Sequence, residues 1–158
     1  MNITVISVGK IKEKYFTAAI DEYSKRLSRF AKLNIIEVAD EKIPDNASEK
    51  EMEQIKEKEG NKILAKLPQN SFVVTLCIEG KEHSSEELAK KIDDISMTSS
   101  HITFIIGGSL GLSDTVKSKS ALRLSFGKMT LPHQLMRVVL LEQIYRAFKI
   151  NNNESYHK

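Results

Sequence analysis

Two patterns of hydrophobic and polar residues alternate along the chain. Short runs rich in Val, Ile and Leu, such as Ile3–Val8, are typical of strands buried in a sheet. Between them lie longer segments in which apolar residues recur every three or four positions, the spacing of a helix with one buried face. Strands are expected at 3–8, 33–38, 71–78, 101–106 and 121–124, and helices at 11–30, 49–66, 84–97, just after Ser113 and at 132–150. This alternation predicts an α/β domain with a parallel sheet covered by helices.

Two of the expected helices begin with a capping box. Ser48 is followed three residues later by Glu51, and Ser84 by Glu87, so each pair can satisfy free backbone N–H groups at a helix start. The first of these helices, 49–66, carries charges of both signs at spacings that allow ion pairs along one face. We therefore interpret it as a solvated helix rather than a nucleic-acid-binding arm.

The last expected helix is apolar on nearly every side. Eleven of the eighteen residues in 133–150 are apolar, and they cover almost the whole circumference. Such a helix must be covered on two sides, and in a chain this small the second cover is most simply another copy of the protein. We expect Glu in place of Arg137 or Leu141 to disrupt this dimer. Glu142 and Arg146 lie one turn apart, which fits either an ion pair within the helix or an arginine that binds phosphate.

Composition narrows the class of protein. The 158 residues, 41% hydrophobic and 28% charged, suffice for one domain with a core of its own. No apolar run approaches the roughly 20 residues that cross a bilayer, and Asn2 with the β-branched run after it does not resemble a secretory signal. Cys77 is the single cysteine and the four histidines are scattered, so neither a disulfide nor a metal site is expected. We expect a cytoplasmic protein without membrane attachment.

The positive charge is concentrated in the last quarter of the chain. Residues 120–158 hold six Lys and Arg against two Asp and Glu, whereas residues 1–119 hold 18 against 19. Cations are generally enriched near helix C-termini, and a basic surface is also what a polyanion such as RNA requires. The charge alone leaves both explanations open.

Turns that contain glycine or other small residues follow four of the expected strands. They are Gly9, Glu79–Gly80, Gly107–Gly111 and Ser125–Gly127. In an open parallel sheet, ligands bind at the carboxyl ends of the strands, and glycine lets them approach the backbone closely. The chain has neither the dinucleotide-binding fingerprint nor a P-loop. These turns therefore predict a site that holds a flat, mostly uncharged ligand through backbone contacts.

Four segments of the sequence are much more specific than these patterns. They read ITVISVGKIKEKY, IGGSLG, SFGKMTLPHQLMRVVLLEQIYRAF and SYHK. In this order they closely resemble the RlmH family, small bacterial enzymes of the SPOUT class of RNA methyltransferases, and the resemblance covers residues 1–158. It implies one SPOUT domain with a deep trefoil knot in its C-terminal part, which periodicity could not indicate. It further implies a homodimer that uses S-adenosylmethionine to methylate N3 of a pseudouridine of 23S ribosomal RNA in the assembled ribosome.

The resemblance also assigns residues to the two halves of the site. The expected cofactor-binding residues are Leu76, Gly108, Gly127, Lys128, Met129, Thr130, Leu131 and Pro132. The expected catalytic residues are His133, Arg146, Tyr156 and His157. His157 suits a base, Tyr156 can stack on or hydrogen-bond a base, and Arg146 can neutralise a phosphate or an imide anion. An alternative for His133 is a helix-terminal residue that bonds only to backbone. Gly127 departs from the expected small polar residue, so the loop is expected to be less well ordered.

The end of the chain, NNNESYHK, takes its meaning from this resemblance. The three asparagines predict a helix stop and turn that brings Tyr156 and His157 to the acceptor side of the site, with the tail ordering when RNA binds. Two other classes of protein are weighed against the methyltransferase. One is a non-catalytic RNA- or ribosome-binding module. The other is a flavodoxin-like protein, for which the segment Gly9–Lys12 lacks a phosphate-binding composition.

Overall fold

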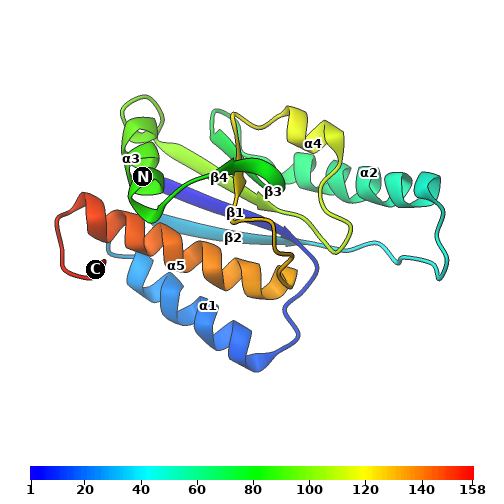
Figure 1. Cartoon of the computed structure of the whole chain (residues 1–158), viewed down its shortest axis with the longest axis horizontal. Coiled ribbons are helices and arrows are strands. Elements are labelled where there is room, and N and C mark those ends of the chain that lie inside the picture. The colour runs from blue at the N-terminus through cyan, green and yellow to red at the C-terminus, as the bar shows by residue number, and fades with distance from the viewer.

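Strands and helices alternate from one end of the chain to the other (Figure 1). The structure is a computed structural model and describes residues 1–158. Its elements are β1 (Asn2–Val8), α1 (Lys14–Leu27), β2 (Lys32–Val38), α2 (Glu49–Lys66), β3 (Phe72–Glu82), α3 (Ser85–Ser96), β4 (His101–Ile106), α4 (Asp114–Ser118), β5 (Leu122–Ser125) and α5 (His133–Asn151). The predicted order of elements is confirmed.

The five strands form one sheet in the order β2-β1-β4-β3-β5, and every pairing is parallel. β1 pairs along its whole length with β2, from Asn2 opposite Lys32 to Val8 opposite Val38. Strands buried on both faces read as continuous apolar runs, which explains why the sequence pattern found them. Because all strands are parallel, their carboxyl ends lie along one edge of the sheet.

The helices cover both faces of the sheet. α1 and α3 each pack against α5 on one face, and α2 with α4 covers the other (Figure 1). The side chains of β1 alternate between the two cores, since Ile3 and Val5 belong to the first and Ile6 and Val8 to the second. The parallel α/β architecture is therefore confirmed. No helix is long and apolar enough to cross a membrane.

Both predicted capping boxes are present. The N–H of Glu51 donates to Ser48 Oγ at 3.1 Å, and the N–H of Glu87 donates to Ser84 Oγ at 3.0 Å. α1 is shorter than the predicted helix, because residues 9–13 form a loop instead. In that loop the N–H of Lys12 donates to Gln134 Oε1 at 3.3 Å, which ties the loop to the start of α5.

β3 is longer than the predicted strand 71–78. Its register against β5 shifts between Leu76 and Lys81, so that the strand bulges and then pairs again as far as Glu82. Gly80 lies in this bulge, and a Cβ there would lie 2.7 Å from the carbonyl oxygen of Arg123. The glycine that predicted a turn thus allows close contact between two neighbouring strands.

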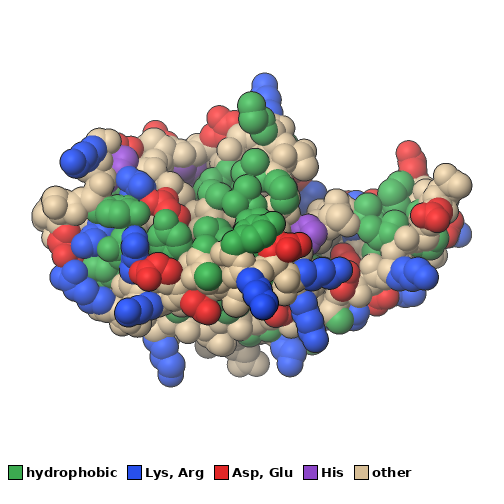
Figure 2. All heavy atoms as spheres, turned by 90° about the horizontal axis from the view of Figure 1, so that it is seen from below, with side chains coloured by type: hydrophobic (Ala, Val, Ile, Leu, Met, Phe, Trp, Pro, Cys, Tyr) green, Lys and Arg blue, Asp and Glu red, His purple; other side chains and the backbone are tan.

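The dimer contacts predicted for Arg137 and Leu141 are wrong. Arg137 is 3% exposed and Leu141 is 1% exposed, and both lie inside their own chain. The surface that a protein uses for a dimer interface is exposed in the single chain, whereas these two side chains are not. Five of the half-buried side chains of α5 recur at helical spacing and form one stripe, here called the outward stripe: Leu135, Val138, Val139, Glu142 and Arg146. Figure 2 views the molecule from below, with hydrophobic side chains gathered near the middle of the face.

Arg137 connects α5 to the end of β1. Its Nη2 donates to the carbonyl oxygens of Val8 and Gly9, each at 2.8 Å, and its Nη1 donates to Glu37 at 2.7 Å. The planar guanidinium suits this arrangement, because its donors point in fixed directions. Burial lowers the pKa of Arg137, and the hydrogen bond to Glu37 opposes that effect. Arg137 therefore fixes the β1–α1 loop beside the carboxyl edge of the sheet.

Candidate active site

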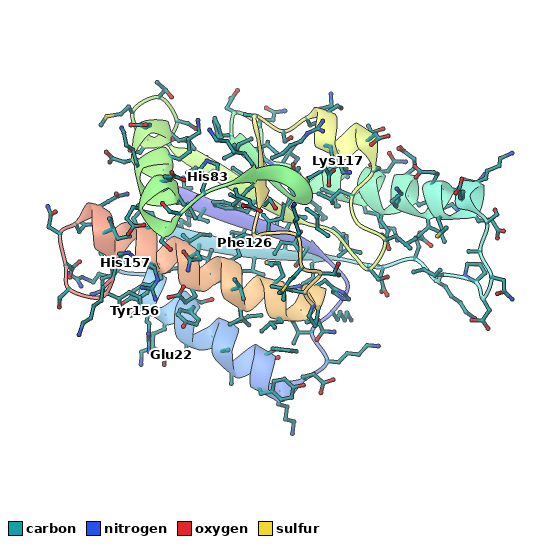
Figure 3. The ribbon with its side chains drawn as sticks, in the orientation of Figure 1. Glu22, His83, Lys117, Phe126, Tyr156 and His157 are labelled. Carbon is teal, nitrogen blue, oxygen red and sulfur yellow. The ribbon has the colours of Figure 1, made fainter.

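A cavity of about 720 Å³ opens at the carboxyl edge of the sheet. Its walls are the bulge of β3, the glycine loop after β4, the loop after β5 and the first turn of α5. Phe126 and Lys117, which line it, are labelled in Figure 3. Three of the four predicted glycine-containing turns therefore meet at one site, and the turn at Gly9 does not line the cavity.

Most of the residues expected to hold a cofactor line this cavity. They are Leu76, Gly108, Gly127, Met129, Thr130, Leu131 and Pro132. Lys128 is the exception, since it is exposed and does not line the wall. Sequence reasoning placed Phe126 in the turn Ser125–Gly127 without giving it a role. It missed Met136, three residues after His133 on α5, and Lys117, which comes from a different element.

The glycine loop after β4 is a tight turn. The N–H of Gly111 donates to the carbonyl oxygen of Gly108 at 3.0 Å, and Gly111 has a φ of +85°. A Cβ on Gly107 would lie 2.8 Å from the carbonyl carbon of Gly111. Side chains are therefore excluded where the turn closes, and a ligand can come close to the backbone.

Ser125 connects the loop after β5 to the bulge of β3. Its Oγ donates to the carbonyl oxygen of Ile78 at 2.9 Å and accepts from the N–H of Gly127 at 3.1 Å. Gly127 has a φ of +115°, a backbone conformation that residues other than glycine rarely adopt. The departure at Gly127 thus matches a strained backbone position. The hydrogen bond to Ser125 anchors the loop at the end of β5, and its looser order stays a prediction.

Glu59 lies behind the glycine loop, outside the cavity. The residue is 5% exposed, and its Oε2 accepts from the N–H of Glu41 at 2.9 Å. A Cβ on Gly108 would lie 3.4 Å from Glu59 Oε1. Burial raises the pKa of Glu59, against the opposing effect of the hydrogen bond from Glu41. A buried carboxyl group therefore supports the turn that carries Gly108.

Glu59→Gln is expected to raise stability at neutral pH and leave it unchanged in acid. Because the folded-state pKa of Glu59 is raised, its contribution to stability is complete below the unfolded pKa, about 4.3. That contribution is lost as the pH rises through the folded-state pKa. Glutamine still accepts from the N–H of Glu41 but carries no charge, so it avoids this loss. Melting temperatures between about pH 4 and pH 8 test the prediction.

The control for this comparison is Glu53→Gln on the same helix, where the side chain is 57% exposed. We expect its melting temperature to follow that of the unmodified protein at every pH. If the curves for Glu59→Gln and the unmodified protein run parallel from acid to neutral pH, Glu59 does not carry the assigned burial cost.

His133 is the one expected catalytic residue on the cavity wall. It begins α5, next to Pro132. Burial lowers the pKa of His133, and the positive charge of Arg137 lowers it further, against an opposing effect of Asp40. A neutral imidazole at the end of the cavity can accept a proton or a hydrogen bond.

The other expected catalytic residues form a second cluster on the C-terminal half of α5. Tyr156 Oη donates to Glu142 Oε1 at 3.1 Å, and the guanidinium of Arg146 lies 4.7 Å from the centre of the Tyr156 ring. Arg146 Nη2 donates to Glu142 at 2.6 Å, which confirms the predicted ion pair within the helix. Burial, and then Glu142, raises the pKa of Tyr156 to about 12. Tyr156 therefore keeps its proton at neutral pH.

His157 completes this cluster and links it to α3. Its Nδ1 lies 3.1 Å from Arg146 Nη1, and its Nε2 lies 2.7 Å from Glu86 Oε1. Arginine can only donate, so Nδ1 of His157 accepts and Nε2–H donates to Glu86. Arg146 and Glu86 therefore hold the imidazole ring from two sides.

The tail packs against α5 and α3, and its ordering on RNA binding stays a prediction. The predicted turn is present, since α5 ends at Asn151 and Asn153 has a φ of +54°. Glu154 then pairs with Arg29 at 2.8 Å. Tyr156 and His157 lie beside α5 in Figure 3.

Within one chain the two groups of expected catalytic residues are separate. His133 and Met136 line the cavity, whereas Arg146 does not. Met136 and Arg146 are ten residues apart, which is roughly 15 Å along a helix axis. The structure thus brings His133 to the expected cofactor residues and leaves Arg146, Tyr156 and His157 at a distance from them.

Proteins of known name resemble this chain along its entire length. It is 63% identical over 159 aligned residues to "Ribosomal RNA large subunit methyltransferase H" of Clostridium botulinum (strain Alaska E43 / Type E3), covering 100% of both chains. It is 60% identical to the protein of the same name from Clostridioides difficile (strain 630), again over 100% of both chains.

A solved structure resembles the fold. "The structure of a probable methylase family protein from Haemophilus influenzae Rd KW20" matches with a TM-score of 0.55 at 13% identity, over 99% of this chain and 70% of that chain. At this identity the match supports the fold alone.

The family model described as "Predicted SPOUT methyltransferase" matches residues 1–157. The chain therefore belongs to the SPOUT methyltransferase family.

Proposed function

We propose that the protein uses S-adenosylmethionine to methylate N3 of a pseudouridine in 23S ribosomal RNA, within the assembled ribosome and as a homodimer. The observation that carries this proposal is the cavity on which seven of the eight expected cofactor residues converge. Relatives with 60% or more identity over the full chain bear the name of a large-subunit ribosomal RNA methyltransferase.

The residues of the cavity suit S-adenosylmethionine. Its volume of about 720 Å³ lies in the range of small-molecule sites. Leu76, Leu131 and Met129 offer apolar cover, and the glycine loops offer backbone donors and acceptors for the adenine. When bound, the cofactor supplies a methyl group on a sulfonium centre. The remaining work falls to the side chains that position the acceptor and remove its proton.

The acceptor chemistry assigns a task to each expected catalytic residue. An in-line displacement requires the acceptor nitrogen to be held opposite the leaving group, with water excluded. The imide proton must also leave, and a neutral histidine is suited to take it. His133 fits by its lowered pKa and its place on the wall. His157 is held in position by Arg146 and Glu86. Arg146 would stabilise the imide anion.

A homodimer would reunite the two groups of expected residues. The outward stripe of α5 is apolar near the cavity, at Leu135, Val138 and Val139, and carries the tail cluster at its other end. If two α5 helices pack antiparallel about a two-fold axis, the tail of each protomer faces the cavity of its partner. We therefore propose that Tyr156 and His157 act on the partner's cavity.

Val139→Glu is expected to convert the dimer into a monomer that keeps its fold. Val139 is half-buried in the single chain, so a charge there can remain solvated until two chains meet. A two-fold interface would receive the charge twice. Light scattering should give half the mass of the unmodified protein, with circular dichroism unchanged. Val139→Ala is the matched control and should stay dimeric; a dimeric Val139→Glu protein would remove α5 from the interface.

The cations near the cavity favour RNA as the substrate. Three of the basic residues in the last quarter are already paired: Arg137 with Glu37, Arg146 with Glu142 and Lys149 with Glu154. The exposed lysines of the β1–α1 loop and of the first position of α1 are an alternative set, and that loop is tied to the start of α5. Figure 2 has Lys and Arg side chains along the edge of the lower face. We propose that Lys10, Lys12 and Lys14 contact phosphates of the RNA.

The resemblance extends the proposal to the architecture. We propose that residues 1–158 form one methyltransferase domain and that its C-terminal part is a deep trefoil knot. A ribosomal substrate would place the protein in the cytoplasm. No cluster of His, Cys, Asp and Glu suited to hold a metal ion is present in the structure.

Tritiated methyl transfer to whole ribosomes and to free ribosomal RNA tests the proposed function. We expect transfer to ribosomes, with 3-methylpseudouridine as the labelled nucleoside after digestion. Calorimetric titration with S-adenosylmethionine should give binding in the absence of RNA. A protein that binds ribosomes but neither binds the cofactor nor transfers methyl groups would instead be the non-catalytic binding module.

A further inference from the structure

Charged side chains are rare on the cavity wall. Of the 22 residues that line it, Lys56, Glu79 and Lys117 are the ones with a full charge. His133 also lines it, and its lowered pKa favours the neutral form. The other polar groups are hydroxyls and backbone. A charged group of a ligand could therefore form an ion pair with only these three residues of the cavity wall.

Glu79 and Lys117 form an ion pair between two walls of the cavity. Lys117 Nζ on α4 donates to Glu79 Oε1 in the bulge of β3 at 2.7 Å. The Lys117 side chain is 20% exposed and that of Glu79 is 55% exposed. Their hydrogen bond lowers the pKa of Glu79 and raises that of Lys117. Both groups are therefore charged at neutral pH, at the edge of the cavity.

The fold has other means of holding α4. The side chain of Ser113 caps this helix by accepting from the N–H of Val116 at 3.3 Å, and Val116 is fully buried. Thr115 donates to Glu57 of α2 at 3.1 Å. An ion pair as exposed as Glu79–Lys117 adds little stability. Its position at the cavity is thus more informative than its effect on the fold.

Lys56 differs from Lys117 in its partner. Lys56 is paired with Glu53 at 2.6 Å, and Glu53 does not line the cavity. In the Glu79–Lys117 pair, both the cation and the anion line the cavity. A cation and an anion side by side on the cavity wall complement a ligand that carries a negative and a positive group close together.

We propose that Glu79 and Lys117 bind the amino-acid end of the methyl donor. This inference rests on the proposed function. The α-carboxylate of the donor would accept from Lys117, and its α-ammonium would donate to Glu79, so the ion pair opens and each partner is satisfied again. Charge-assisted hydrogen bonds of this kind are strong and directional. The apolar and backbone-rich remainder of the cavity is left for the adenosine.

Two ligands that differ in their amino-acid end test the assignment. S-Adenosylhomocysteine has this end, and 5′-methylthioadenosine keeps the adenosine and the sulfur without it. Calorimetry should give a Kd for S-adenosylhomocysteine that rises roughly 10-fold to 100-fold in Lys117→Met, the range for a lost hydrogen bond to a charged group. The Kd for methylthioadenosine should stay within about twofold. Glu79→Gln should give the same selective loss.

Matched controls are available beside both residues. Lys119→Met and Glu82→Gln change exposed residues that do not line the cavity, and neither should alter the Kd of either ligand. An equal loss for both ligands in Lys117→Met, or no loss in both cavity variants, would overturn the assignment. If the unmodified protein binds neither ligand, the proposed function itself fails. These results are distinguishable because the unmodified protein is measured first.

Discussion

Arg137→Met is expected to lower the free energy of unfolding by about 3 kcal/mol, since each buried acceptor left without a donor costs roughly 1–3 kcal/mol. The variant removes the donors to the carbonyl oxygens of Val8 and Gly9, which are buried hydrogen bonds. Glu37 loses its partner too, but its side chain is 37% exposed and can be solvated. Urea denaturation followed by circular dichroism measures the loss.

Arg146→Met is the matched control for this experiment. It makes the same change nine residues later on α5, where the arginine pairs with Glu142 and is 24% exposed. Ion pairs of this kind along a helix stabilise by about 0.3–0.5 kcal/mol. If Arg137→Met costs no more than Arg146→Met, then the fold does not depend on the connection between α5 and the end of β1.

The contrast between these two arginines explains what the sequence could not indicate. Arg137 and Arg146 both stand in an apolar helix, and periodicity treats them alike. The partners of Arg137 lie 100 or more residues earlier in the chain, whereas the carboxylate that pairs with Arg146 is one turn away and its other contacts, Tyr156 and His157, follow within 11 residues. Local spacing therefore predicted the second contact and misplaced the first at an interface.

The strands and helices themselves were largely predictable. Parallel strands are buried on both faces, so Ile3–Val8 and His101–Ile106 appear as apolar runs whatever the tertiary contacts. Capping boxes fixed two helix starts, since the capping bonds are local. The extension of β3 to Glu82 was missed because Gly80 meets the backbone of Arg123, a contact between strands.

The candidate site was predictable where its residues lie in turns. Glycine at the ends of strands marked the loops that carry Gly108 and Gly127, and the parallel sheet explains why these loops meet. Lys117 carried no such mark, and Glu79 was marked only as part of the turn Glu79–Gly80, without a role for its carboxylate. Each is an ordinary charged residue until the fold places α4 beside the bulge of β3. Glu59 was likewise read as part of a solvated helix, and it is buried.

Deletion of Tyr156–Lys158 is expected to reduce methyl transfer about 100-fold or more, the scale of a lost acid–base group, with little effect on cofactor binding. These residues pack on Glu142, Arg146 and Glu86 rather than on the cavity wall. Single-turnover transfer to ribosomes and calorimetry with S-adenosylhomocysteine measure the two effects. Deletion of the exposed Lys158 alone is the control and should leave both unchanged. Activity retained in the longer deletion would make the tail dispensable.

Mixed dimers decide which cavity the tail serves. One chain lacks Tyr156–Lys158 and keeps an intact cavity. The other keeps its tail and carries Thr130→Trp, a large side chain at an exposed position of the cavity wall that is expected to block its own cavity. Each homodimer should be inactive. If the tail acts across the interface, the mixed dimer combines the intact cavity of one chain with the intact tail of the other, and activity returns at one site. If the tail acts on its own cavity, neither chain holds a complete site and the mixed dimer stays inactive. The roughly 15 Å of helix between Met136 and Arg146 favours the first result, because a partner's antiparallel α5 spans that distance.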